Sequence, residues 1–196
     1  MAQASTLLAL MLLTTAANLT GLAAWNNENY LRDACSVTRY RNLCILSLSS
    51  FSDECKTSPS KWARAGVSVA LAEAKRVSQY LTQLNKSNQA RERRSRAALY
   101  DCVEVFQNAI DDLHQSLGVL RSLSRTTFDT QMGDLNNWLS STLTDADTCL
   151  EGFQGQRGRQ VRSIQIRVTK VSYITSNALA LANKLASTGF RSSFDP

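Results

Sequence analysis

Residues 58–84 read SPSKWARAGVSVALAEAKRVSQYLTQL, and this stretch decides the fold class of the chain. Ser58 followed by Pro59 is typical of a helix start, with serine as the N-cap and proline at the first helical position. Beyond them, apolar side chains recur at steps of three and four residues. They are Ala63, Val67, Ala70, Leu71, Ala74, Val77, Leu81 and Leu84. This spacing predicts one long amphipathic helix.

Three later segments repeat the same apolar spacing. They cover residues 98–120, 132–153 and about 161–186. Polar residues at 122–127 and a glycine-rich stretch at 152–158 separate them, and the third bundle helix, over residues 132–153, either continues or breaks near Asp145. The simplest solution is an all-α, up-down-up-down four-helix bundle over residues 57–196.

Residues 25–56 precede the bundle and carry two short apolar stripes, at 30–34 and 40–46. Cys35 and Cys44 stand nine positions apart, so a disulfide between them would close the segment. A closed loop of this size stabilises a fold by about 2–3 kcal/mol in the chain-entropy model. We therefore expect a small disulfide-closed helical hairpin ahead of the bundle.

Two more cysteines fall on the predicted bundle helices, Cys102 early in the second and Cys149 late in the third. Antiparallel neighbours place these points at the same end of the bundle, so a bridge between them is geometrically sensible. It would close a loop of about 48 residues and stabilise the fold by about 4 kcal/mol. Of the five cysteines, Cys55 is then left as a free thiol.

Residues 1–24 have the features of a signal peptide: no charged side chain, a short apolar core and small residues before Trp25. Ala17 is an alternative cleavage point, and an uncleaved anchor is the alternative to removal. Two disulfides would agree with an oxidising, secreted location. Asn85-Lys86-Ser87 is a candidate glycosylation sequon.

The formal net charge of +6 admits polyanionic partners, among them nucleic acid, acidic membrane and acidic polysaccharide. The basic run at residues 91–96 lacks the interleaved aromatic side chains on which bases stack, which disfavours nucleic acid. We expect no nucleic-acid partner, and no membrane partner after signal cleavage. Ordinary solubility is the alternative explanation of the charge.

A catalytic constellation is not recognisable in the sequence. His114 is the only histidine, and its position on a helix edge favours a structural or surface role. The nucleophile elbow of hydrolases is absent, and no cluster has the spacing of metal ligands. Asp111-Asp112 and Asp145-x-Asp147 bring carboxylates close together, but adjacent helical residues point to different faces, and a solvated helix face is the better explanation. We expect no catalytic residue, metal or cofactor.

Four short motifs follow one another along the chain. They are CSVTRYRNLC at 35–44, ALYDCVEVF at 98–106, LTDADTCLEGF at 143–153 and SNALALANKL at 176–185. In this order they resemble the motifs of the plant pectin methylesterase/invertase inhibitors, and the resemblance covers residues 25–186. Arg41 stands where that family often has proline, and Glu151 where it usually has aspartate; neither change affects the expected fold.

The resemblance implies a four-helix bundle with a preceding hairpin, and the disulfides Cys35–Cys44 and Cys102–Cys149. It also implies a protein inhibitor that forms a stoichiometric, non-covalent complex over the active-site cleft of its target enzyme. Asp145, Asp147 and Thr148 are carried over as partner contacts, because they lie in the matched Thr-Cys block. Thr148 has a second interpretation, as a helix-end hydroxyl beside a disulfide.

Family members that inhibit invertases tend to carry a Pro-Lys-Phe contact motif, which this chain lacks, since Pro59 is followed by Ser-Lys. Pectin methylesterase is therefore the expected partner, and cell-wall or vacuolar acid invertase the alternative. We also expect weak binding to acidic pectin and a location in the cell wall. The protein is expected to be a monomer or a dimer. A wall-binding structural protein and a small enzyme are the competing classes of function.

Overall fold

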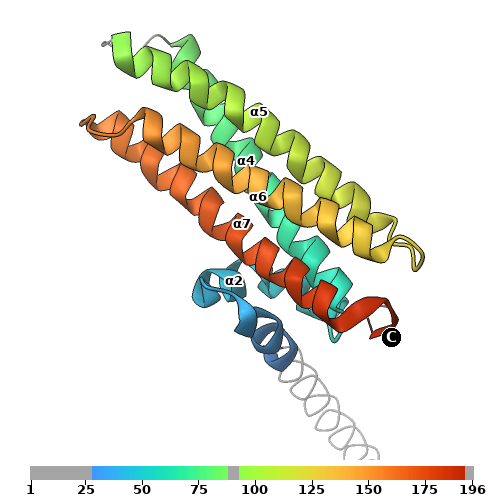
Figure 1. Cartoon of the computed structure of the whole chain (residues 1–196). Coiled ribbons are helices and arrows are strands. Elements are labelled where there is room, and N and C mark those ends of the chain that lie inside the picture. The colour runs from blue at the N-terminus through green and yellow to red at the C-terminus, as the bar shows by residue number, and fades with distance from the viewer. Residues whose placement is uncertain (1–27, 88–92, 193–196) are drawn as a thin grey trace, which may run out of the picture.

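Four long helices form the body of the protein in the computed structural model, which describes residues 28–87 and 93–192 (Figure 1). They are α4 (Pro59–Lys86), α5 (Arg93–Arg121), α6 (Phe128–Gly152) and α7 (Arg159–Ser192). Successive helices run in opposite directions, and α7 returns to pack against α4, which closes the ring of four. The predicted all-α, up-down-up-down bundle is confirmed. The expected signal peptide lies outside the described residues.

The start of α4 follows from its first residues. The Ser58 hydroxyl caps the helix by accepting a hydrogen bond from the Lys61 amide, and Pro59 occupies the first turn. A proline there lacks only an N–H that the helix leaves unpaired anyway. The other helix bounds differ slightly from the periodicity, because α6 begins at Phe128 and runs unbroken past Asp145 to Gly152.

The core lies along the bundle axis and contains the predicted apolar stripes. Its largest fully buried side chains come from all four helices and from the α6–α7 connection. They include Leu81, Phe106, Leu113, Leu135, Leu139, Phe153, Ile164, Leu181 and Leu185. Shortening one buried leucine to alanine in such a core costs about 2–5 kcal/mol.

Helices α4 and α7 approach each other closely at Gly66. A Cβ atom built on Gly66 would lie 3.0 Å from Leu181 Cδ1 and 3.3 Å from Ala178 Cα. Further along the same pair, the buried carboxylate of Glu73 forms ion pairs with Arg76 and, at 3.1 Å, with Lys170 of α7. The contact between α4 and α7 therefore combines a small residue with polar cross-links.

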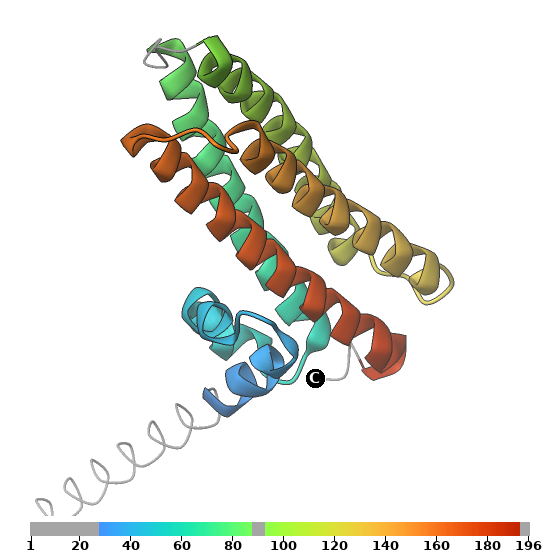
Figure 2. The ribbon, with the colours of Figure 1, turned by 60° about the vertical axis from the view of Figure 1, so that its left-hand side comes forward.

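The hairpin consists of short helical pieces: residues 28–34, η1 (Cys35–Val37), α2 (Arg41–Leu48), η2 (Ser49–Phe51) and α3 (Ser52–Cys55). A disulfide joins Cys35 to Cys44, with the Cα atoms 5.8 Å apart. The hairpin packs against α4 and α7 beside the bundle, near the start of α4 and the end of α7 (Figure 2). The predicted disulfide-closed hairpin ahead of the bundle is confirmed.

One side-chain amide ties the hairpin to the bundle. Asn177 of α7 accepts a hydrogen bond from the Tyr40 backbone N–H at 3.1 Å and donates one to the Tyr40 carbonyl at 3.0 Å. The Tyr40 ring also stacks on Tyr173, with the ring centroids 3.9 Å apart. An ion pair between Lys184 and Asp33, at 2.8 Å, adds a third tie.

Candidate partner-binding surface on α5 and α6

Helices α5 and α6 are joined covalently near one end of the bundle. The disulfide between Cys102 and Cys149 places their Cα atoms 4.6 Å apart, and both residues are buried. A stapled helix pair loses little conformational freedom when a partner docks on it. Its exposed side is therefore a suitable interaction surface.

This helix pair is strongly acidic. Residues 97–151 contain nine acidic side chains and only two basic ones, Arg121 and Arg125. The exposed carboxylates of α5 and α6 define what we call the acidic surface. They are Asp101, Glu104, Asp111, Asp129, Asp134, Asp147 and Glu151. Such a surface attracts a partner with positive potential and disfavours an acidic one.

Asp145, one of the expected contact residues, is half-buried on α6. Its Oδ2 atom is buried and has no hydrogen-bond partner among the described residues. Burial, and secondly the carboxylate of Asp112 on α5, raise the pKa of the Asp145 carboxyl to about 6. Asp145 thus holds its proton in mildly acidic solution, unlike an ordinary aspartate.

Asp147 and Thr148 are both exposed on the same helix. The Thr148 hydroxyl donates a hydrogen bond of 2.9 Å to the Thr144 carbonyl one turn earlier, so only its lone pairs are left for a partner. The structure therefore does not gather the three expected contact residues into one cluster. Asp147 and Thr148 are exposed to a partner, whereas Asp145 is half-buried and faces Asp112 of α5.

Sequence reasoning missed an exposed aromatic residue on the same helix pair. Tyr100 of α5 is 61% exposed, two residues before Cys102. Exposed tyrosines are enriched among the residues that contribute most to binding in protein interfaces. Its signal was available in the sequence, since Tyr100 lies off the apolar stripe that includes Ala98, Cys102 and Phe106.

Other chemistry is sparse in the described part of the chain. His114 is exposed on α5. No group of three or more histidine, cysteine, aspartate or glutamate side chains there is arranged to hold a metal ion. None of the helices in residues 28–87 and 93–192 is long and apolar enough to cross a membrane.

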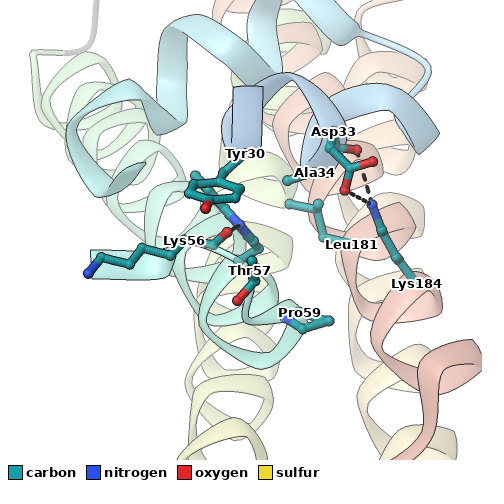
Figure 3. Close-up of a pocket in the computed structure, with 9 residues that line it drawn as sticks. Tyr30, Asp33, Ala34, Lys56, Thr57, Pro59, Leu181 and Lys184 are labelled. Atoms are coloured by element: carbon teal, nitrogen blue, oxygen red, sulfur yellow. Dashed lines mark hydrogen bonds and ion pairs between the residues drawn. The ribbon is translucent and has the colours of Figure 1, made fainter. Parts of the chain in front are cut away.

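A cavity of about 140 Å³ lies where the hairpin meets the bundle (Figure 3). Tyr30, Lys56 and Pro59 line one part of it, and the ion pair between Asp33 and Lys184 borders another. Pockets for small-molecule ligands usually measure about 300–1,000 Å³. This cavity is a packing gap at the joint between hairpin and bundle rather than a ligand site.

The sequence model of the plant invertase/pectin methylesterase inhibitors matches residues 29–181. The chain belongs to this family. The match includes the hairpin, the two disulfides and most of the bundle.

Comparison with known proteins agrees with the assignment. The chain is 44% identical over 164 residues to Pectinesterase inhibitor 6 of Arabidopsis thaliana, covering 83% of this chain and 78% of that protein. It is 35% identical to Pectinesterase inhibitor 3 of the same plant, covering 82% and 81%. The crystal structure of a mutant form of an Arabidopsis pectin methylesterase inhibitor superposes with a TM-score of 0.63 at 20% identity, over 77% of this chain and 93% of that one.

The family and these relatives carry the names of inhibitors. The chain is accordingly an inhibitor-type protein and not an enzyme. The crystal structure adds an independent view of the fold, since helical bundles with so little shared sequence align over most of their length.

Proposed function

We propose that this protein inhibits pectin methylesterase by forming a stoichiometric, non-covalent complex that covers the active-site cleft of the enzyme. The observation that carries the proposal is the stapled α5–α6 pair with its acidic surface and exposed Tyr100, in a chain whose relatives are named pectinesterase inhibitors. Inhibition of acid invertase is the alternative within the same family.

The physical properties of the surface suit a tight and specific complex. Exposed carboxylates such as Asp147 accelerate encounter with a positively charged partner, and the exposed Tyr100 ring supplies apolar area on the same helix pair. A standard interface buries about 1,600 Å² in total. Helices of 25 and 29 residues are long enough to provide one side of such an interface.

The first test is an inhibition titration of the oxidised protein against a plant pectin methylesterase at mildly acidic pH, with an acid invertase in parallel. We expect loss of esterase activity at a one-to-one ratio and no effect on the invertase. Loss of invertase activity alone would favour the alternative, inhibition of acid invertase. If neither enzyme loses activity, the proposal is overturned.

Variants then locate the contact. Tyr100→Ala is expected to weaken inhibition at least about tenfold, because truncating an aromatic hot-spot residue of an interface commonly costs more than 1.4 kcal/mol. Ile166→Ala is the matched control, since Ile166 is 63% exposed but lies on α7. Asp147→Asn should slow association measurably, whereas Glu54→Gln, which removes a carboxylate from the hairpin, should not. Equal effects of variant and control would exclude the α5–α6 surface.

We place the action of the inhibitor in the cell wall, after secretion and removal of residues 1–24. The two disulfides support an oxidising location. Asn85 is exposed in the last turn of α4, where a glycan would meet solvent. Expression in plant cells with mass analysis of the secreted protein tests both points: we expect a start at Trp25 and a glycan mass that disappears in Asn85→Gln.

A further inference from the structure

Two short segments of this protein are densely basic. The chain has 22 basic and 16 acidic residues. Segments 86–96 and 151–162 hold eight of the basic residues and two of the acidic ones, which gives these 23 positions a net charge of +6. In the rest of the chain, the acidic segment 97–150 offsets the basic excess of the other parts.

The fold brings the described parts of the two segments, residues 86–87, 93–96 and 151–162, together at one end of the bundle, where α4 and α6 end and α5 and α7 begin (Figure 1). Ser95 of α5 donates a hydrogen bond to the Gln156 side chain, and an Arg94 guanidinium nitrogen donates one of 3.5 Å to the Gln154 carbonyl. We call this region the arginine-rich end. Its described basic residues are Lys86, Arg93, Arg94, Arg96, Arg157, Arg159 and Arg162.

An open groove of about 580 Å³ runs across this end. Arg157, Arg159 and Arg162 line it together with Gln156 and Gln165, and no carboxylate does. The three arginines are exposed, and none of them forms an ion pair with a carboxylate within residues 28–87 and 93–192. Their guanidinium groups are thus available to an anion from solution.

We propose that the arginine-rich end binds a linear polyuronate, the de-esterified form of pectin. Each guanidinium presents a planar fork that matches one carboxylate, and the two glutamines can exchange hydrogen bonds with sugar hydroxyls. No aromatic side chain lines the groove, so the stacking that single-stranded nucleic acid requires is missing. The choice of polyuronate among polyanions rests on the proposed function, because a pectin methylesterase creates carboxylates on pectin.

This surface is separate from the acidic surface but close to it, since Asp147 precedes Arg157 by ten residues. An inhibitor with both would hold newly de-esterified polymer beside the enzyme that it blocks. The opposite charges of the two regions also set their partners apart, because a polyuronate is repelled by the carboxylates of α5 and α6.

The test measures binding of the oxidised protein to polygalacturonate by calorimetry, with fully methyl-esterified pectin as the uncharged probe. We expect binding to polygalacturonate that weakens with added salt, and none to the esterified polymer. The triple variant Arg157→Gln, Arg159→Gln, Arg162→Gln should bind about three- to 150-fold more weakly, since each of the three exposed ion pairs contributes about 0.2–1 kcal/mol. The matched control is Lys61→Gln, Arg121→Gln, Arg125→Gln, which removes the same charge from the opposite end of the bundle.

Three outcomes would overturn the proposal: no binding at low salt, equal weakening in both triple variants, or equal binding to the esterified polymer. Binding of duplex DNA or dextran sulfate as tight as that of polygalacturonate would also overturn it, because the site would then be a general polyanion surface. Esterase inhibition measured on the same samples separates the two proposals. If the protein still inhibits the esterase but does not bind polygalacturonate, only the proposal for the arginine-rich end is rejected.

Discussion

At the scale of single residues, the carboxyl group of Asp145 links stability to pH. Its pKa in the folded protein is about 6, against about 4 for an ordinary aspartate, so the folded state binds the proton more tightly than the unfolded state. The stability that depends on this proton is complete below pH 4 and is lost as the pH rises through 6. The half-buried position keeps the effect moderate, because solvent screens it.

Asp145→Asn should remove this dependence, because the amide stays neutral at every pH. We expect the variant to match the parent protein at pH 4 and to exceed its unfolding free energy by about 1–2 kcal/mol at pH 7. Urea unfolding followed by circular dichroism at both pH values measures the difference. Asp147→Asn, an exposed change of the same charge, is the control, and a parallel gain in that variant would contradict the argument.

Cys55 illustrates a second effect of burial on a single group. Desolvation first, and the neighbouring Glu54 carboxylate second, raise the pKa of its thiol to about 11, against the opposing influence of Lys61 and Arg64. We expect alkylation at pH 8 to be slower by about two orders of magnitude than for a free cysteine, because the thiolate is the reactive form. Mass spectrometry after iodoacetamide treatment, with and without denaturant, tests this; rapid labelling of the native protein would show that the thiol is accessible.

At the scale of elements, the attachment of the hairpin depends strongly on Asn177. Asn177→Ala leaves the partly buried backbone N–H of Tyr40 without its acceptor, which costs about 1–3 kcal/mol. Hydrogen exchange at residues 40–44 should accelerate while the bundle core remains protected. The exposed Asn183 of the same helix provides the control, since its replacement by alanine should change neither the stability of the protein nor hydrogen exchange at residues 40–44. Unaltered exchange in Asn177→Ala would mean that other contacts hold the hairpin.

The glycines of the bundle helices have different roles, and alanine substitution separates them. Gly118→Ala meets no atom within 4 Å and should stabilise the protein by about 0.5–1 kcal/mol through helix propensity. Gly66→Ala places its methyl group 3.3 Å from the Ala178 backbone, so overpacking of about 1–3 kcal/mol exceeds that gain. The thermal unfolding midpoints of the two variants should therefore shift in opposite directions. A higher midpoint in both would show that α7 moves enough to accommodate the added methyl group.

The elements themselves were predictable where local rules suffice. Ser58 and Pro59 start α4 as expected, and the apolar spacing identifies all four bundle helices. The clamp of Asn177 on Tyr40 was not predictable, because its partners are 137 positions apart in the chain. The candidate site is also only partly predictable from the sequence. The motif places Asp147 and Thr148 on a helix, whereas the burial of Asp145 depends on packing between helices.

At the scale of the whole molecule, the two disulfides should contribute unequally. Cys102 and Cys149 close a loop with a separation of 47, and Cys35 and Cys44 one of nine. The chain-entropy model assigns them about 4 and about 3 kcal/mol. Denaturation of the variants Cys102→Ala/Cys149→Ala and Cys35→Ala/Cys44→Ala should reproduce this order, and only the first should loosen the acidic surface. The reverse order would show that hairpin docking, rather than loop closure, dominates.

Charge is also organised over the whole molecule, in a way that the total of +6 conceals. Residues 97–150 carry eight acidic and two basic side chains, segments 86–96 and 151–162 carry two acidic and eight basic ones, and the rest of the chain carries six acidic and 12 basic ones. The composition alone admits polyanionic partners, and the fold adds that the described arginines of segments 86–96 and 151–162 lie at one end of the bundle, whereas the proposed enzyme contact lies on α5 and α6.

The buried position of Cys55 has a consequence for how the chain acquires its bonds. Cys44 is nine residues from Cys35 and eleven from Cys55, so in an unstructured chain it meets either one with nearly equal ease. The correct choice becomes secure only once α3 has settled on α4 and hidden the competing thiol. Oxidative folding should therefore depend on the order of events: premature oxidation would trap a mispaired hairpin, and a disulfide isomerase would be needed to release it.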